Sequence, residues 1–574
     1  MKFKTLLISM FSAIAVNAYA IVAPKTPIQY TQPDGTVITL QMHGDEFHHW
    51  VTSGGRVVQM DADGFYRPCA TAASAAPEMH ERRSQAAALR ERALASRTIS
   101  QGRKKFLVLL VEFSDLKFAT EGANSLFDDL LNKDGYSHEG SKGSVHDYYF
   151  NNSNGKFDPD YDVVGPVTLD KSYKYYGGNN AGGNDTHPEE ALYDACVKID
   201  GDIDFSVYDN DGDGYVDNVF FFYAGYGEAQ GGGDDTIWPH SWSLQYSSNY
   251  KVRANRFDGV KVGSYACASE LMGYSGTSID GIGTFCHEFG HVLGLPDFYD
   301  TDYSENGTAA LTPDFYSLMS SGSYNDNSHR PPYLSYYERV MLGWADEHTV
   351  AAGEYVLRGV EHDDGYVLLT DNPGERFYIE YRDMTGWDLP LKSYIGYPQA
   401  LLVYHLDQSQ NKVSRYTAAA LWGVNMVNCF ASHPCYRLID DSTYYGKLGV
   451  SVNSVDFIPW SGIATGLFMD GISFSGDGLS VNFSISDGNA PEELEDLGFS
   501  YIYSPRSEYL AGHRFELILA ETEGRKGGNV TWYYDGVMQN SRYVSLKAGT
   551  HVVRADVEYP DGSKEIIEAE IVAK

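Results

Sequence analysis

Runs of apolar residues predict the central elements of this chain. Phe106–Phe113 (FLVLLVEF) and Val219–Tyr223 (VFFFY) are short and bounded, which is typical of strands covered on both faces. Between Ser278 and Leu293 apolar residues recur at helical spacing, with Ser278 as a candidate N-cap. Gly294, followed by Pro296, is a stop signal. The pattern therefore predicts two buried strands and a helix that ends at Gly294.

The N-terminal region has a different pattern. Strand-like pieces at Thr36–Met42 and Trp50–Met60 are separated by turn residues, and Glu81–Ala95 has the Arg-rich composition of an exposed helix. The basic run Arg103-Lys104-Lys105 follows, and we expect it to be accessible to trypsin-like cleavage. Residues 21–103 are interpreted as a detachable prosegment, the alternative being a small domain that is retained.

Strand signals dominate after about residue 348. Residues 348–488 are predicted to form a mostly β domain, with the strand-like runs Tyr355–Arg358, Tyr366–Thr370, Arg376–Tyr381 and Leu401–His405. Residues 489–574 are predicted to form an Ig-like β-sandwich, because apolar and polar residues alternate from Val553 to Tyr559 and again from Ile567 to Ile571.

Composition and the first residues restrict the classes of protein. The 43% hydrophobic content of the 574 residues excludes a mainly disordered chain, and a net charge of −35 argues against nucleic acid or an anionic membrane as partner. Residues 1–20 combine Lys2 and Lys4, an apolar run and the small-x-small site Ala18-Tyr19-Ala20, which predicts a signal peptide. No later run reaches about twenty apolar residues, so we expect secretion without a membrane anchor.

The six cysteines include no C-x-x-C pair. Export permits disulfides, although a chain of this size does not need them. Cys429 and Cys435 are the closest pair and the candidate for a bond.

The predicted helix carries the main chemical motif, His287-Glu288-Phe289-Gly290-His291, continued by Gly294 and Asp297. Two histidines four apart lie on one helix face and can bind one cation, and the glutamate beside them can accept a proton from water. Zinc suits such a site, with Asp297 as third ligand. Asp297 has two alternative roles, capping the turn or binding another cation. The alternative for the histidines is a structural role in a buried helix.

A second motif places Asp209, Asp211, Asp213 and Asp217 at relative positions 1, 3, 5 and 9 of a loop. This spacing matches the first part of an EF-hand calcium loop, although position 12 is Phe220 and a strand follows. The motif predicts a Ca²⁺ site outside an EF-hand. The alternative is a solvated acidic turn.

These motifs resemble the immune inhibitor A-like family of secreted zinc metallopeptidases. Besides HEFGHVLGLPDFYD, the matching pieces are KKFLVLLVEFSD, GSVHDYYFNNSNGKFDP, DNDGDGYVDNVFFFYAGYGEA, IWPHSWSL and SLMSSGSY, spread over residues 104–345. PPYLSYYERVMLGW and GWDLPLKSYIGYPQALLVYHLD extend the resemblance to residue 407. The resemblance implies an endopeptidase that acts on protein substrates and is made as a zymogen.

The extended motif and Met319 also resemble the metzincins, in which a methionine turn lies beneath the metal. Most metzincins have a third histidine where this chain has Asp297. His240 and Tyr324 are candidates for a donor to the oxyanion of the reaction, and their alternative is a structural or cleft-lining role.

The expected architecture is thus a signal peptide (1–20), a prosegment (21–103), an α+β zinc-peptidase domain with an active-site helix (104–347), a mostly β domain (348–488) and a β-sandwich (489–574). The expected function is zinc-dependent hydrolysis of peptide bonds, with Glu288 as general base. One alternative is a secreted calcium-dependent adhesion or glycan-binding protein on an inactive peptidase scaffold. Another is a zinc hydrolase that cuts a different bond.

Latency follows from the predicted prosegment, with the mature N-terminus between about Arg90 and Phe106. Cys69, as a thiolate, or Asp45, as a carboxylate, could block the zinc. The alternative is purely steric blocking.

Overall fold

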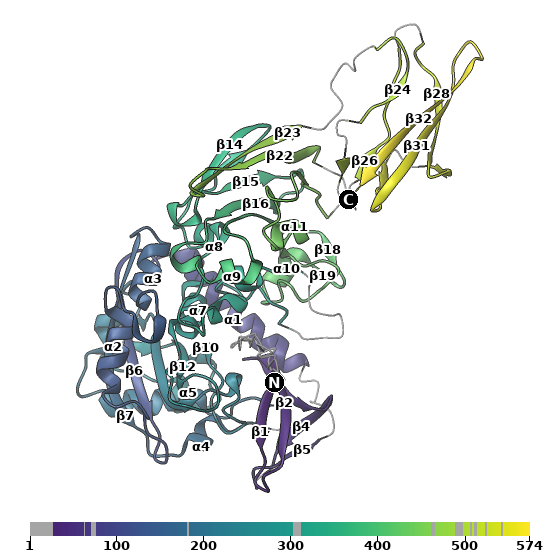
Figure 1. Ribbon diagram of the computed structural model, residues 1–574. Helices are drawn as coiled ribbons and strands as arrows, with labels where there is room; N and C mark the ends of the chain where they lie inside the picture. The colour runs from purple at the N-terminus through teal and green to yellow at the C-terminus, as the bar shows by residue number, and fades with distance from the viewer. Residues whose placement is uncertain are drawn as a thin grey trace, which may run out of the picture.

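The computed structural model describes residues 27–573, apart from 62, 70–75, 181–182, 302–310, 461–464, 488–496, 505–507, 510–513, 523–524 and 541–542. The predicted signal peptide lies outside the described residues. Figure 1 shows the N-terminal strands at one end of the molecule and the C-terminal strands at the other. No helix among the described residues is both long and apolar enough to span a bilayer.

The N-terminal unit is an antiparallel meander followed by a long helix. Its elements are β1 (Ile28–Thr31), β2 (Val37–Asp45), β3 (His48–Ser53), β4 (Arg56–Met60), β5 (Tyr66–Pro68) and α1 (Ala76–Ser96). Apolar residues of the meander, including Ile28, Leu40 and Val51, share a core with Trp238 of the next domain. The meander is therefore docked on its neighbour.

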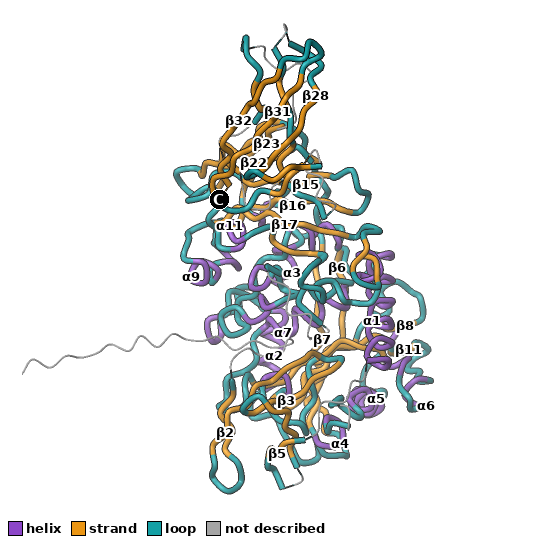
Figure 2. Tube along the Cα trace, turned by 90° about the vertical axis from the view of Figure 1, so that its right-hand side faces the viewer, coloured by secondary structure: helices purple, strands orange, loops and turns teal. Residues whose placement is uncertain are grey.

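Helix α1 corrects the prediction of an exposed helix. It packs along α7 (Ile282–Leu293), and Figure 2 shows it beside β8 (Tyr215–Val216) and β11 (Lys261–Val262). Arg83 and Arg90 are only 2% and 6% exposed. Arg83 is buried because it pairs with Asp45, 3.0 Å away, and donates to the Thr301 carbonyl.

The central domain is built on a five-stranded sheet ordered β10-β12-β9-β6-β7, in which only β10 is antiparallel to its neighbour. Its strands are β6 (Gly102–Glu112), β7 (Phe157–Thr168), β9 (Val219–Tyr226), β10 (His240–Ser243) and β12 (Ser264–Leu271). The other helices of the domain are α2 (Ala123–Asn132), α3 (Val145–Asn152), α4 (Tyr173–Gly177), α5 (Pro188–Ile199), α6 (Tyr250–Arg253) and α8 (Tyr336–Met341).

Strand β6 explains the continuous apolar run. Phe106, Val108 and Leu110 face the core shared with α7, whereas Leu107 and Leu109 face the core shared with α5. Helices cover both faces of the sheet at this point, so every residue from Phe106 to Val111 is apolar. The predicted strands at 106–113 and 219–223 are confirmed, with the first beginning earlier, at Gly102.

The basic junction lies in a paired strand rather than in a free segment, although the Arg103 side chain is exposed. Arg103, Lys104 and Lys105 lie inside β6 and pair with β7. Cleavage there would remove ladder hydrogen bonds of an inner strand. The exposed stretch before the buried residues 99–100 is residues 95–98, which comprises the end of α1 and the two residues after it.

The next domain contains two sheets that enclose one apolar core. The first is β13 (Thr349–Val350), β15 (Tyr366–Leu369), β16 (Glu375–Arg382), β17 (Ala400–Asp407) and β20 (Tyr436–Leu438), and the second is β14 (Gly353–Arg358), β21 (Val455–Asp456), β22 (Leu467–Phe474) and β23 (Ser480–Asp487). Three short helices, α9 (Leu391–Ile395), α10 (Ala418–Trp422) and α11 (Asp441–Tyr444), and the pair β18 (Lys412–Val413) and β19 (Tyr416–Thr417) complete it. The four strands predicted here are confirmed.

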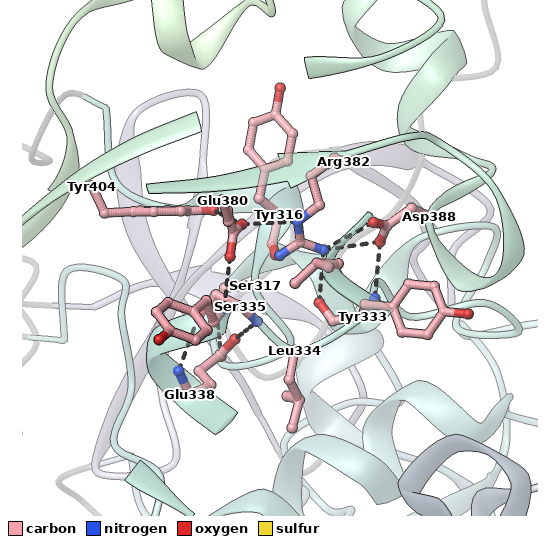
Figure 3. Close-up of polar contacts among 12 residues, drawn as sticks. Tyr316, Ser317, Tyr333, Leu334, Ser335, Glu338, Glu380, Arg382, Asp388 and Tyr404 are labelled. Atoms are coloured by element: carbon pink, nitrogen blue, oxygen red, sulfur yellow. Dashed lines mark hydrogen bonds and ion pairs between the residues drawn. The ribbon is translucent and has the colours of Figure 1, made fainter. Parts of the chain in front are cut away.

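A buried polar network joins this domain to the central one (Figure 3). Arg382 of β16 bonds Glu380 and Asp388, at 2.8 and 3.0 Å, and donates to the carbonyls of Tyr333 and Tyr316. The bonds that cross the domain boundary are hydrogen bonds, because the Tyr333 and Tyr336 amides also donate to Asp388 and Glu380. The ion pairs of Arg382 keep these buried partners in place.

The C-terminal strands include a five-stranded sheet, β25 (Glu508–Tyr509), β32 (Lys564–Ala573), β31 (Gly549–Glu558), β28 (Asn529–Tyr534) and β29 (Val537–Gln539). The remaining pairs are β24 (Tyr501–Ile502) with β27 (Leu519–Ala520) and β26 (Arg514–Glu516) with β30 (Tyr543–Ser545). Val553, Ala555 and Val557 are buried in β31, which confirms the predicted alternation. The Ig-like assignment stays a prediction.

Candidate metal centre

Helix α7 presents the H-E-x-x-H motif. It begins at Ile282 with Gly281 as N-cap, later than the predicted start, because Ile279 bridges to Leu271 and the Asp280 amide bonds the Glu270 carbonyl. It ends at Gly294, as predicted, with φ 116°. This left-handed residue lets the chain reverse toward the histidines.

Three side chains converge at this reversal. The Oδ1 atom of Asp297 lies 3.3 Å from Nε2 of His287 and 3.3 Å from Nε2 of His291. Apart from one another, these three buried atoms have no hydrogen-bond partner among the described residues. Ligands about 2.0–2.1 Å from a tetrahedral zinc lie roughly 3.3 Å apart, so the group fits zinc.

Both rings are oriented by main-chain carbonyls. Nδ1 of His287 is 2.8 Å from the Leu318 carbonyl, and Nδ1 of His291 is 2.8 Å from the Leu295 carbonyl. These contacts place N–H on Nδ1 and leave Nε2 free of a proton, the form that binds a metal. Burial also lowers the pKa of His287, which favours the neutral ring.

Met319 lies under the same helix. Its side chain is fully buried, and a Cβ added at Gly290 would meet its sulfur at 2.7 Å. Glycine between the two histidines therefore allows this close approach. The segment from Ser317 to Met319 is bonded to the polar network of Figure 3, because the Ser317 hydroxyl donates to Glu338 and accepts from the Met319 amide.

The acidic residues of the site have opposite protonation tendencies. Burial raises the pKa of Glu288 well above its usual value, and the charge of Asp297 raises it further. Burial would raise the pKa of Asp297 too, but positive charge on His291 and His287 would hold it well below its ordinary range, a part that a bound cation takes when the rings are neutral. The geometry thus separates a carboxylate that stays ionised from one that can take up a proton.

His240 and Tyr324, the two candidates for a donor to the oxyanion, have different surroundings. Both nitrogens of His240 are engaged, Nδ1 with the Trp238 carbonyl and Nε2 with the Tyr265 hydroxyl, at 2.7 Å each. This favours the structural role for His240. Tyr324 is buried, and after burial itself the charges of Asp280 and Glu288 raise its pKa, which places it near the proposed base.

The turn between β2 and β3 covers the site. Glu46 is 8% exposed, and burial together with the charges of Asp297, Asp45 and Glu288 raises its pKa well above the usual value. A cavity of about 270 Å³ lies between this turn, α1 and the central domain, lined by residues that include Glu46, Arg90 and His291.

This arrangement revises the two blocking groups considered from the sequence. Asp45 pairs with Arg83 and accepts from the Phe47 amide, 2.9 Å away, so its carboxylate is already used within the N-terminal unit. Cys69 is an exposed thiol at the end of β5. Glu46, the next residue, lies near Asp297 and Glu288, whose charges raise its pKa, although no sequence motif marks it.

His49 anchors the same segment. Its Nε2 is 3.1 Å from Glu228, and its ring stacks on Trp238 at 4.2 Å. Burial alone would lower the pKa of His49, but the Glu228 carboxylate raises it to about 9. The segment thus docks through a buried ion pair.

The acidic loop is only partly assembled. Asp209, Asp211 and Asp217 bring one oxygen each within 4.8 Å of one another, and Asp213 is not part of that group. Burial raises the pKa of Asp217 to about 6, so a cation bound at the cluster would stabilise its ionised form. Asp213 instead accepts from the Tyr215 amide.

The predicted disulfide is wrong. Cys429 and Cys435 are both buried and form no disulfide with each other. The Cys429 sulfur lies 3.3 Å from the Thr301 hydroxyl instead.

Comparisons with known proteins agree with this geometry. Residues 94–341 match the family described as immune inhibitor A peptidase M6, catalytic domain. Immune inhibitor A of Bacillus thuringiensis subsp. alesti is 29% identical over 286 residues, or 42% of this chain and 41% of that protein. The pre-pro-metalloprotease PrtV of Vibrio cholerae serotype O1 is 30% identical over 256 residues, or 38% of this chain and 27% of that protein.

The matches cover less than half of either relative's length. A solved structure of Clostridium thermocellum CbhA fibronectin(III)-like modules aligns with 13% of this chain and 97% of its own length. The identity is 12% and the TM-score is 0.11. The matched segment, by contrast, holds the histidines, Glu288 and Asp297 in one site. Residues 94–341 are therefore similar to the catalytic domain of the immune inhibitor A (M6) peptidase family.

Proposed function

We propose that this protein is a secreted zinc-dependent endopeptidase of protein substrates, made as a zymogen. The observation that carries the proposal is the buried triangle of His287, His291 and Asp297, with its 3.3 Å separations and Glu288 beside it. The description of the matching family supports peptidase activity, and one relative is named a pre-pro-metalloprotease.

In the proposed reaction the chain holds the metal and moves a proton. Zinc bound at the triangle would acidify a water molecule and polarise the scissile carbonyl. Glu288 accepts the proton of the attacking water and then delivers it to the leaving amine, a role that suits a buried carboxyl with a raised pKa. Tyr324 is the candidate donor to the oxyanion.

The N-terminal unit would keep the enzyme inactive. Its β2–β3 turn brings Glu46 to the metal site, and α1 packs along α7. Removal of this unit would open the site to a peptide. Cleavage within the exposed stretch 95–98 would leave β6 intact.

Calcium is proposed as a structural ion at Asp209, Asp211 and Asp217. Three carboxylates this close repel one another unless a cation lies among them. Asp211 also accepts from Thr98, so the loop touches the junction between α1 and β6.

Zinc content and hydrolysis of casein, measured on the same preparations, test the proposal. The activated parent should hold one zinc and cut casein, whereas His291→Ala and Asp297→Ala should lose the metal. A parent that holds no zinc, or that holds it without cutting casein, would contradict the proposal and favour the adhesion protein or a hydrolase of another bond. Stoichiometric zinc in Asp297→Ala would move the third ligand elsewhere.

A further inference from the structure

A residue of the downstream β domain reaches the metal site. Asn425 lies in the loop after α10, is fully buried and has φ +54°. Its Nδ2 donates to Oδ2 of Asp297 over 2.6 Å, and its Oδ1 accepts from the Asp297 amide over 3.0 Å. Thus one side chain holds both the carboxylate and the main chain of the same residue.

These two bonds fix how the Asp297 carboxylate is oriented. The main-chain N–H of Asp297 can only donate, so Oδ1 of Asn425 must face it and the NH₂ group must face the carboxylate. Oδ2 of Asp297 is thereby occupied, and Oδ1 is the atom left 3.3 Å from each histidine. The arrangement selects a single oxygen for the cation.

The loop that carries Asn425 is itself immobilised. The main-chain carbonyl of Asn425 accepts from the Thr301 hydroxyl over 2.6 Å, and Val427, two residues on, is buried in the core shared with the central domain. Asn428, three residues on, is equally buried, but it donates to the carbonyls of Phe298 and Tyr436 rather than to the carboxylate of Asp297, so it serves as a comparison for Asn425.

We propose that Asn425 is a positioning residue for the third metal ligand, so that the β domain completes the metal site. This inference rests on the proposed function, because it takes Asp297 as a ligand. The family match ends at residue 341, well before Asn425, so the orienting group comes from outside the matched segment. Outer-shell partners of this kind typically change metal affinity about 10–100-fold when removed.

The test measures zinc affinity by chelator competition, with zinc itself as probe, on the full chain. Asn425→Gly keeps the left-handed backbone and removes the amide, and Asn428→Gly is the matched control in the same loop. Asn425→Gly should bind zinc about 10–100-fold more weakly and shift the visible spectrum of the Co²⁺ form. Asn428→Gly should lower thermal stability but keep zinc affinity within about threefold of the parent.

Asn425→Asp provides a second variant if the glycine variant does not fold. When ionised, it retains the shape and the acceptor for the Asp297 amide but cannot donate to the carboxylate, so it too should weaken zinc binding. Parental zinc affinity in a folded Asn425 variant, or equal losses in Asn425→Gly and Asn428→Gly, would overturn the inference. Asp297→Ala distinguishes failure of the positioning role of Asn425 from failure of the ligand role of Asp297. If it loses zinc while Asn425→Gly does not, only the positioning role fails. If it keeps parental affinity, the proposed ligand and the inference fail together.

Discussion

Docking of the N-terminal unit should depend on the buried pair between His49 and Glu228. The structure raises the pKa of His49 from 6.5 to about 9, which corresponds to about 3 kcal/mol at roughly 1.4 kcal/mol for each pH unit. Removing one partner of a buried pair costs a similar amount, about 3–5 kcal/mol, because the other charge is left unpaired. His49→Ala should therefore weaken docking by about 3 kcal/mol.

Hydrogen exchange of the β2–β4 amides measures this loss, in a Glu288→Gln background that prevents self-cleavage. A loss of about 3 kcal/mol speeds exchange through local opening about a hundredfold. The control is His43→Ala, since His43 bonds Thr52 and stacks on Trp50 within the meander, and it should change exchange less than about tenfold. Adding Glu228→Gln to His49→Ala should restore part of the protection. Parental exchange rates in His49→Ala would refute the reasoning.

The pair of His49 and Glu228 also makes docking of the N-terminal unit depend on pH. Because docking raises the pKa of His49, its stabilisation is complete below about pH 6.5 and is lost as the pH rises through about 9. Burial also raises the pKa of Glu228, Asp185 and Asp234, the carboxylates around it, and this acts in the same direction. Protection of the meander should fall with rising pH, and a rise would contradict the assignment.

Two further predictions concern the calcium loop and latency. With zinc saturating, EGTA should lower the Tm of the parent but not that of an Asp211→Asn/Asp217→Asn variant, because a cation bound only to the folded form stabilises it; an unmoved parental Tm would reject the calcium site. A Cys69→Ala precursor should stay as latent as the parent, since that thiol is exposed, whereas Glu46→Ala should hydrolyse a small peptide faster before cleavage. Prompt activation of Cys69→Ala would show that the thiol blocks the site after all.

Local patterns predicted the elements that carry the site. The strand at 106–113 was visible because helices cover both of its faces, so residues 106–111 are all apolar. The end of α7 was visible because Gly294 takes a left-handed conformation. The start of α7 was not visible. Residues 278–280 pair with residues at the end of β12, and the spacing of apolar residues does not reveal this pairing.

Contacts between distant segments escaped prediction. Helix α1 has the composition of an exposed helix, and only the fold brings Asp45 and the Thr301 carbonyl to Arg83. Asn425 lies 128 residues after Asp297, with no motif around it. Pairing of Cys429 with Cys435 was inferred from nearness in sequence, which does not fix the separation of two sulfurs in the fold.

The central claim is that Glu288 acts as general base in peptide hydrolysis at a zinc site. Mass spectrometry of a protein mixture digested by the activated parent and by Glu288→Gln tests it most directly. The account predicts many internal cleavages with the parent and, in a variant that still holds one zinc, a loss of about three decades in their rate. Cleavage by Glu288→Gln within tenfold of the parent would contradict it.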